Sequence, residues 1–197
     1  NAAIIIGARR PNLAPAPAAV AMPVTYTGPV LLGSLTLYFG EDDGLGDGLG
    51  RPGSFPESEA ARTAFFAILT SPGTEAFDGM TAGTILPLSV VFADGVTGVL
   101  DTPDATARAN TFIVSTPSGD NAGRYPHSGN QYLRPRFFLS AGASLHLAVT
   151  PSITGFGFLG IDVGDIGSRL SLEVTFDDDT TETVAIPHLI EDPLLPV

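Results

Sequence analysis

Short runs of β-forming residues recur along most of this chain, and turn residues separate them. The runs after residue 73 include TEAF, ILPLSVVF, TFIV, RPRFFL, ASLHLAVT and RLSLEVTF. The chain has 23 glycines and 17 prolines among 197 residues, and only 15% of its residues are charged. This composition favours short strands joined by tight turns over long surface helices. Roughly nine such runs predict an all-β fold, an antiparallel β-sandwich of jelly-roll-like type.

The clearest local pattern is a hairpin near the end of the sequence. Apolar residues alternate with polar ones over residues 170–176, and the aspartates of 177–179 then form a turn into a second strand over 181–186. This alternation is typical of an antiparallel strand with one wet face. We expect an inner layer on two neighbouring strands of one sheet, formed by Phe156, Phe158, Leu170, Leu172, Val174 and Phe176.

A similar period of two places Leu35, Leu37 and Phe39 on one face of an earlier strand. The one helix that the sequence predicts covers residues 55–69. Ser54 stands at the N-cap position, Glu57 follows as a capping-box partner, and an apolar stripe contains Ala61, Phe65, Ile68 and Leu69.

The start of the sequence has a different composition from the rest. An apolar triplet, Ile4, Ile5 and Ile6, precedes a segment over residues 11–17 that is rich in proline and alanine and cannot be helical. We therefore divide the chain into an N-terminal arm with its spacer at 1–22 and a single β-sandwich domain at 23–197. The arm is expected to be a strand held away from the body.

Charge and residue usage exclude several classes of function. The formal net charge is -12, and all 9 basic residues are arginines, so no basic stripe is available for nucleic acid or an anionic membrane. No apolar run approaches the roughly 18 residues that a membrane span needs. There are 0 cysteines and 3 histidines, and no nucleophile elbow or metal-hydrolase motif occurs. The sequence thus predicts a protein that is not an enzyme.

Several segments occur in a recognisable order: AARTAFFAIL, TEAFDG, GRYPHSGNQYLR and ITGFGFLGIDVGDIGSRLSLEVTF. Over about residues 54–188 the chain resembles the extracellular β-sandwich proteins of Gram-negative bacteria that carry a PEP-CTERM sorting tail. The resemblance implies a secreted, extracellular or cell-surface protein with a jelly-roll-like body. The sorting tail and the closing strands usual in this group have no counterpart in this sequence, so the anchoring mode stays open.

Two acidic segments are candidate calcium sites. Asp42, Asp43 and Asp47 lie in a glycine-rich loop, and Asp162 and Asp165 follow an apolar strand. Carboxylate oxygens are the ligands that calcium prefers. A solvated turn explains the first group equally, and capping of backbone amides explains the second.

One further loop has the residue types that bind sugars. Residues 123–132 bring together polar and aromatic side chains that hydrogen-bond and stack, namely Arg124, Tyr125, His127, Asn130 and Tyr132. Loops on a rigid sandwich are a common place for ligand sites. The alternative is that the tyrosines cover the edge of the sandwich while the arginine pairs with an acid.

These observations favour a structural subunit of an extracellular filament, sheath or coat. Its N-terminal strand, with Ile4, Ile5 and Ile6, is expected to insert into a neighbouring copy by donor-strand exchange, the partner being the same protein. The arm folding back into its own domain is the competing possibility. A module that binds extracellular glycan through the 123–132 loop is the alternative function, and a hydrolase on the same scaffold is a third.

Overall fold

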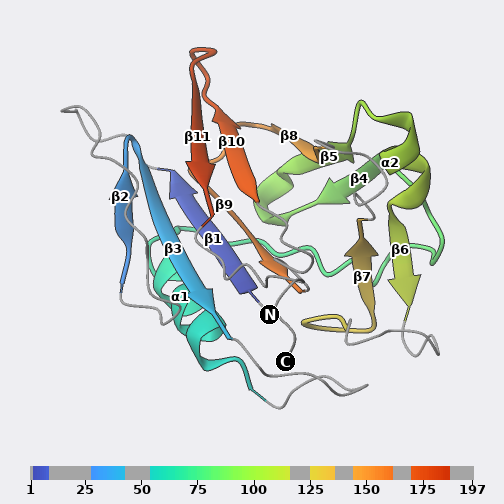
Figure 1. Ribbon diagram of the computed structural model, residues 1–197, viewed down its shortest axis with the longest axis horizontal. Coiled ribbons are helices and arrows are strands. Elements are labelled where there is room, and N and C mark those ends of the chain that lie inside the picture. Colours follow the sequence, from blue (N-terminus) through green and yellow to red (C-terminus); the bar gives the residue numbers. More distant parts are fainter. Residues whose placement is uncertain are drawn as a thin grey trace, which may run out of the picture. The chain divides into compact units, whose positions relative to one another are not determined.

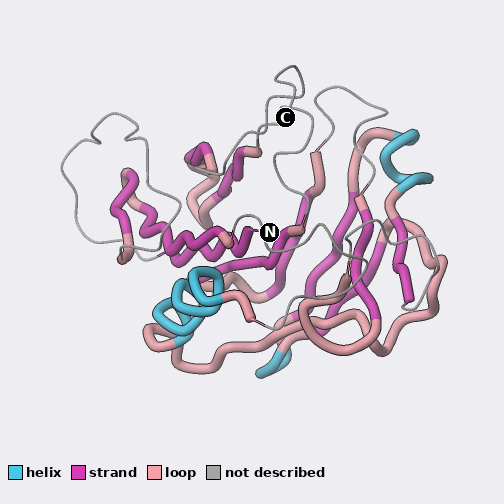
Figure 2. The backbone as a smooth tube through the Cα atoms, turned by 60° about the horizontal axis from the view of Figure 1, so that its bottom comes forward, coloured by secondary structure: helices cyan, strands magenta, loops and turns pink. Residues whose placement is uncertain are grey.

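The computed structural model describes residues 2–8, 28–42, 54–115, 125–135, 144–161 and 170–186, with the backbone alone for residues 2–8 and Ala93. Strands in several small antiparallel sheets dominate this part of the chain, together with the helices α1 (Pro56–Phe66) and α2 (Ala105–Asn110) (Figure 2). The expected all-β character is confirmed at this level. Neither helix has the length and apolar character needed to cross a bilayer within the described residues.

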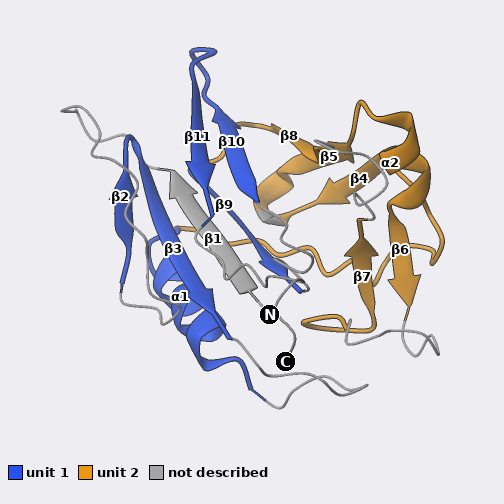
Figure 3. Cartoon of the chain, viewed as in Figure 1, with its two compact units in different colours: residues 1–69, 154–197 blue, residues 70–153 orange. Residues whose placement is uncertain are grey.

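The chain forms two compact units, coloured separately in Figure 3. Unit 1 contains Asn1–Leu69 and Thr154–Val197, and unit 2 contains Thr70–Ile153. Two compact units can still fold cooperatively as one domain, so a single domain over residues 23–197 stays a prediction.

Unit 1 contains a four-stranded sheet with the order β2-β3-β1-β9 (Figure 1). Its strands span Val30–Leu32, Leu35–Glu41, Ala2–Ala8 and Gly155–Gly160 in that order. A separate hairpin pairs β10 (Ser171–Thr175) with β11 (Thr181–Ala185). The hairpin is the one that the sequence predicts, and Asp179 adopts a φ of 62° in its turn.

The core of unit 1 joins this sheet to the hairpin. Leu35, Leu37 and Phe39 are buried together with Val184 and Ile186. Half-buried apolar side chains pack against them, including Phe158, Leu170, Leu172, Val174 and Phe176. Five of the six residues expected in the inner layer thus pack against this core, whereas the sixth, Phe156, lies beside Phe158 with ring centroids 6.1 Å apart. β9 and β10 belong to different sheets and are not neighbours in one sheet. Alternation identifies the buried face of a strand and not the sheet to which the strand belongs.

The N-terminal segment forms the predicted strand in an unexpected place. β1 does not stand away from the body, because it pairs antiparallel with β3 on one side and with β9 on the other. The arm thus folds back into its own domain, which is the possibility that competes with donor-strand exchange. A strand between two others satisfies its backbone donors and acceptors on both sides, whereas an isolated strand satisfies them on neither. The free energy gained from the hydrogen bonds on both sides of β1 explains why this strand lies within the sheet and not away from the body.

Helix α1 is shorter than predicted and begins differently. It begins at Pro56, and the N-cap residue is Phe55, which has no side-chain oxygen for capping; Ser54 is therefore not the cap. It ends at Phe66, and Ile68 is 53% exposed, so this residue does not belong to the buried stripe. Ala61 and Phe65 are buried as predicted, and Leu69 packs beside Phe65.

Unit 2 contains a three-stranded sheet, β4-β5-β8, and a two-stranded sheet of β6 and β7. These strands span Leu88–Val91, Thr97–Asp101, His146–Thr150, Phe112–Ser115 and Gln131–Arg134 in that order. A short 3-10 turn, Ala93–Gly95, connects β4 to β5. The core of this unit contains Leu86, Leu88, Val90, Leu100 and Ile113.

Unit 2 differs from the sequence predictions in three places. Residues 74–77 form no strand, and Phe77 there has a φ of 63°. The strand expected from Arg134 onward lies earlier, as β7, and residues 136–139 are outside the described part. Helix α2 was not anticipated, although Asp104 is a good N-cap residue and its side chain accepts a hydrogen bond from the N–H of Ala107.

Candidate assembly site

The site that the fold makes available for assembly is the position between β3 and β9, which we call the strand slot. β1 occupies it along its whole length. In the register, Ile4 lies opposite Phe39 and Phe158, and Ile6 lies opposite Leu37 and Phe156. Residues directly opposite each other in an antiparallel pair share one face of the sheet. Positions 4 and 6 thus lie on the sheet face that carries the core of unit 1.

The first turn of α1 is held by a residue that follows β3. The carboxylate of Asp42 accepts hydrogen bonds from the N–H groups of Glu57 (3.0 Å) and Ser58 (2.9 Å), one on each oxygen. The Ser58 hydroxyl donates to the carbonyl oxygen of Gly40 at 3.3 Å. A helix leaves its first N–H groups without intrahelical partners, and its N-terminus favours a negative charge. Asp42 follows β3 and is 5% exposed. Its carboxylate supplies both the hydrogen-bond acceptors and the negative charge that the start of α1 favours.

Helix α1 also contacts the strands on both sides of the slot. It lies against β1 and β3, and the rings of Tyr38 on β3 and Phe65 on α1 are 5.8 Å apart. On β9, a Cβ atom added to Gly155 would lie 3.0 Å from the ring of Phe65 and 3.1 Å from Leu69. The helix therefore lies over β1 and β3, and the side chains of Phe65 and Leu69 reach Gly155 of β9.

The hairpin covers the opposite face of the same sheet. Its residues Val184 and Ile186 share a core with Leu37 and Phe39 of β3, and Phe158 of β9 packs against that core. The carboxylate of Glu182 accepts hydrogen bonds from the Ser34 N–H at 3.1 and 3.3 Å and from the Ser34 hydroxyl. The slot thus has a helix on one face and a hairpin on the other.

Of the five predicted calcium residues, only Asp42 lies in the described part of the chain. Both carboxylate oxygens of Asp42 bind the first turn of α1. Asp43, Asp47, Asp162 and Asp165 lie outside the described residues. Within the ranges that are described, no three acidic or histidine side chains form a group suited to a metal ion.

The predicted ligand loop is only partly available at the surface. Arg124 lies outside the described residues, and Tyr125 is only 7% exposed. His127 is half-buried, Asn130 is exposed, and Tyr132 lies half-buried in β7. One carboxylate oxygen of Asp78 accepts hydrogen bonds from the N–H groups of Asn130 (2.7 Å) and Gln131 (3.0 Å). Burial of Tyr125 agrees with the alternative that tyrosine covers the protein's own surface here.

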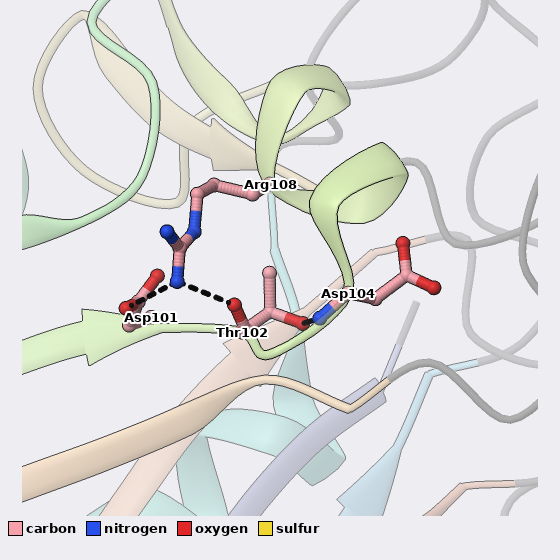
Figure 4. A network of polar contacts seen from close by, with 4 residues as sticks. All are labelled: Asp101, Thr102, Asp104 and Arg108. Carbon is pink, nitrogen blue, oxygen red and sulfur yellow. Dashed lines mark hydrogen bonds and ion pairs between the residues drawn. The ribbon is translucent and has the colours of Figure 1, made fainter.

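The polar network in Figure 4 belongs to unit 2 and ties α2 to the end of β5. Arg108 donates to the Asp101 carboxylate at 2.8 Å and to the Thr102 carbonyl at 2.9 Å. The Asp104 N–H donates to the Thr102 hydroxyl at 3.3 Å, and the Asp104 side chain caps α2. The Arg108 and Asp101 side chains are 43% and 35% exposed, so water screens this ion pair. The arrangement fastens a short helix to the end of a strand.

Sequence reasoning missed three residues that shape the slot: Gly40, Glu182 and Asp42 in its role as a cap. Two signals were present. Pro56 follows Phe55, so a helix begins with proline at N1 and no capping residue before it, which calls for a cap from elsewhere. A glycine inside an apolar strand, as at position 40, often marks a close backbone approach.

Comparison with known proteins returns no match to this chain among protein-family models, curated proteins or solved structures. The resemblance to the PEP-CTERM group remains a prediction drawn from the segments quoted above. The functional argument therefore rests on the residues and geometry of the chain itself.

Proposed function

We propose that this protein is a structural subunit of an extracellular or cell-surface assembly, built on a β-sandwich and joined by exchange of β1 between copies. The observation that carries the proposal is the position of β1. This strand lies between β3 and β9, and only residues 9–29 connect it to β2. A strand with two ladders contributes much of the cohesion of its sheet, so its transfer to a neighbour would join two molecules firmly.

Exchange costs little because the same contacts form within one chain and between two. The backbone hydrogen bonds of β1 and the partners of Ile4 and Ile6 do not depend on which copy donates the strand. Domain swapping is for this reason a low-cost route to association. Covalent linkage of a strand to its own domain can give the intramolecular form an effective concentration in the millimolar range. Self-pairing should therefore dominate in dilute solution, and exchange should dominate where copies are crowded on a surface.

The connection between β1 and β2 is long for the distance it must cover. The two strands lie on either side of β3, which separates them by about 10 Å. Residues 9–29 span about 65 Å if they are extended. The excess length gives β1 the reach to enter the slot of a neighbour.

A disulfide lock tests the proposal directly, since the chain has 0 cysteines. Gly7 lies opposite Thr36 in the register of β1 and β3. Opposite Cα atoms are about 4.5–5.5 Å apart, a distance that a disulfide spans. The variant G7C/T36C, oxidised while dilute, should stay monomeric when concentrated, and reduction should restore assembly in light scattering and electron microscopy.

Mixing two single variants provides the complementary measurement. G7C and T36C proteins, concentrated together and oxidised, should yield a disulfide between chains, because only an exchanged β1 brings these positions together. G7C mixed with T183C, which places cysteine at an exposed position of β11, is the control for random oxidation. Equal assembly of the locked and reduced forms, or equal cross-linking in both mixtures, would show that the proposal is wrong.

Binding of an extracellular glycan by the 123–132 loop is a second candidate function. One observation favours it: Asp78 fixes the backbone at Asn130 and Gln131, and a fixed, partly exposed loop suits a ligand site. Screening against a glycan array tests it, with N130A as the matched variant. Absence of binding by the parent protein would remove this candidate.

A further inference from the structure

We infer that α1 acts as a strap across the strand slot and that Asp42 controls how readily β1 leaves it. This inference rests on the proposed function for its purpose but not for its geometry. It concerns the regulation of the exchange step. All the contacts that carry it lie within unit 1.

The path of α1 over the sheet follows from its contacts. Its first turn lies over Gly40 of β3, which pairs with Ala3 of β1. Near its end, the ring of Phe65 lies against Gly155 of β9, which pairs with Gly7 of β1. The helix itself lies over β1 and β3, so it covers one face of β1 while a single side chain reaches β9. Figure 1 shows α1 beside β1 and β3.

The faces and edges of the slot are then accounted for. β3 and β9 hold the edges of β1 by hydrogen bonds, α1 covers one face, and the hairpin covers the other. β1 cannot leave until one of these covers moves. The hairpin shares an extensive core with β3. The first turn of α1 meets β3 largely through polar contacts, among them the two hydrogen bonds to Asp42 and the one from Ser58 to Gly40. We therefore expect the start of α1 to be the cover that opens first.

Hydrogen exchange of the β1 amides tests this strap without requiring any assembly. In D42N, one of the two helix N–H groups would face an amide donor in place of a carboxylate oxygen. We expect the amides of residues 2–8 to exchange about tenfold faster than in the parent protein, as the loss of a helix cap implies. The matched control is D104A, which removes the cap of α2 in unit 2 and should leave β1 unchanged.

Three outcomes are informative. Faster exchange of β1 in D42N but not in D104A, with faster cross-linking of G7C and T36C in the D42N background, is the expected result. If the α1 amides exchange faster while those of β1 do not, or if D104A has the same effect on β1, the strap inference is wrong. If β1 is released in D42N and yet no disulfide forms between chains, the strap stands and the proposed exchange function fails. D42A provides a stronger perturbation, and restoration of protection by D42E would locate the effect in the carboxylate.

Discussion

Gly40 leaves no room for a side chain beneath the first turn of α1, so its replacement by alanine is a strong test of the fold. A Cβ atom at this position would lie 2.1 Å from the carbonyl oxygen of Glu57 and 2.5 Å from its carbonyl carbon. Both atoms belong to the backbone, so no side-chain rotation relieves the overlap. The helix must move away from the strand by about 1 Å to reach an ordinary contact distance.

That movement stretches the two hydrogen bonds between Asp42 and the helix from 3.0 and 2.9 Å to a length at which they no longer hold. Hydrogen bonds to a charged group each contribute about 1.5–3 kcal/mol, while Gly→Ala stabilises by about 0.4–1 kcal/mol through the unfolded chain. The expected net loss for G40A is therefore about 2–5 kcal/mol in the free energy of unfolding.

Urea unfolding followed by circular dichroism measures this loss. The control is G79A, because a Cβ atom at Gly79 meets nothing within 4 Å. G79A should differ from the parent protein by less than about 0.5 kcal/mol. If G40A is as stable as G79A, the close approach of α1 to β3 does not exist, and the strap argued from it fails as well.

Two other predictions concern the core and the acidic loop. F39A should lower the free energy of unfolding by about 3–5 kcal/mol, because Phe39 is 1% exposed. L31A, at a residue that is 54% exposed, should change it by less than about 0.5 kcal/mol. Equal effects of the two substitutions would contradict the placement of the core. Calcium at the predicted Asp42, Asp43 and Asp47 loop should raise the melting temperature by binding the folded state, so EDTA should lower it. An unchanged melting temperature after chelation would leave Asp42 with its helix-capping role alone.

Local sequence specified the elements whose pattern repeats over neighbouring residues. The hairpin of β10 and β11 and the buried face of β3 follow from alternation with a period of two, because successive side chains of a strand point to opposite faces. The burial of Ala61 and Phe65 follows in the same way from helical spacing. Each of these features depends on residues close together in the chain, so its signal is visible without the fold.

Tertiary structure alone decided which elements meet. Nothing within residues 2–8 specifies β3 and β9 as partners, because any open strand edge offers the same backbone donors and acceptors. The alternation in β9 and β10 is equally compatible with one sheet or with two facing sheets, and the shared core with β3 selects two. The sequence predicts that Asp42 is a carboxylate of the glycine-rich loop. It becomes the cap of α1 because the end of β3 and the start of the helix meet in space, and that meeting is set by the free energy of contacts between distant segments.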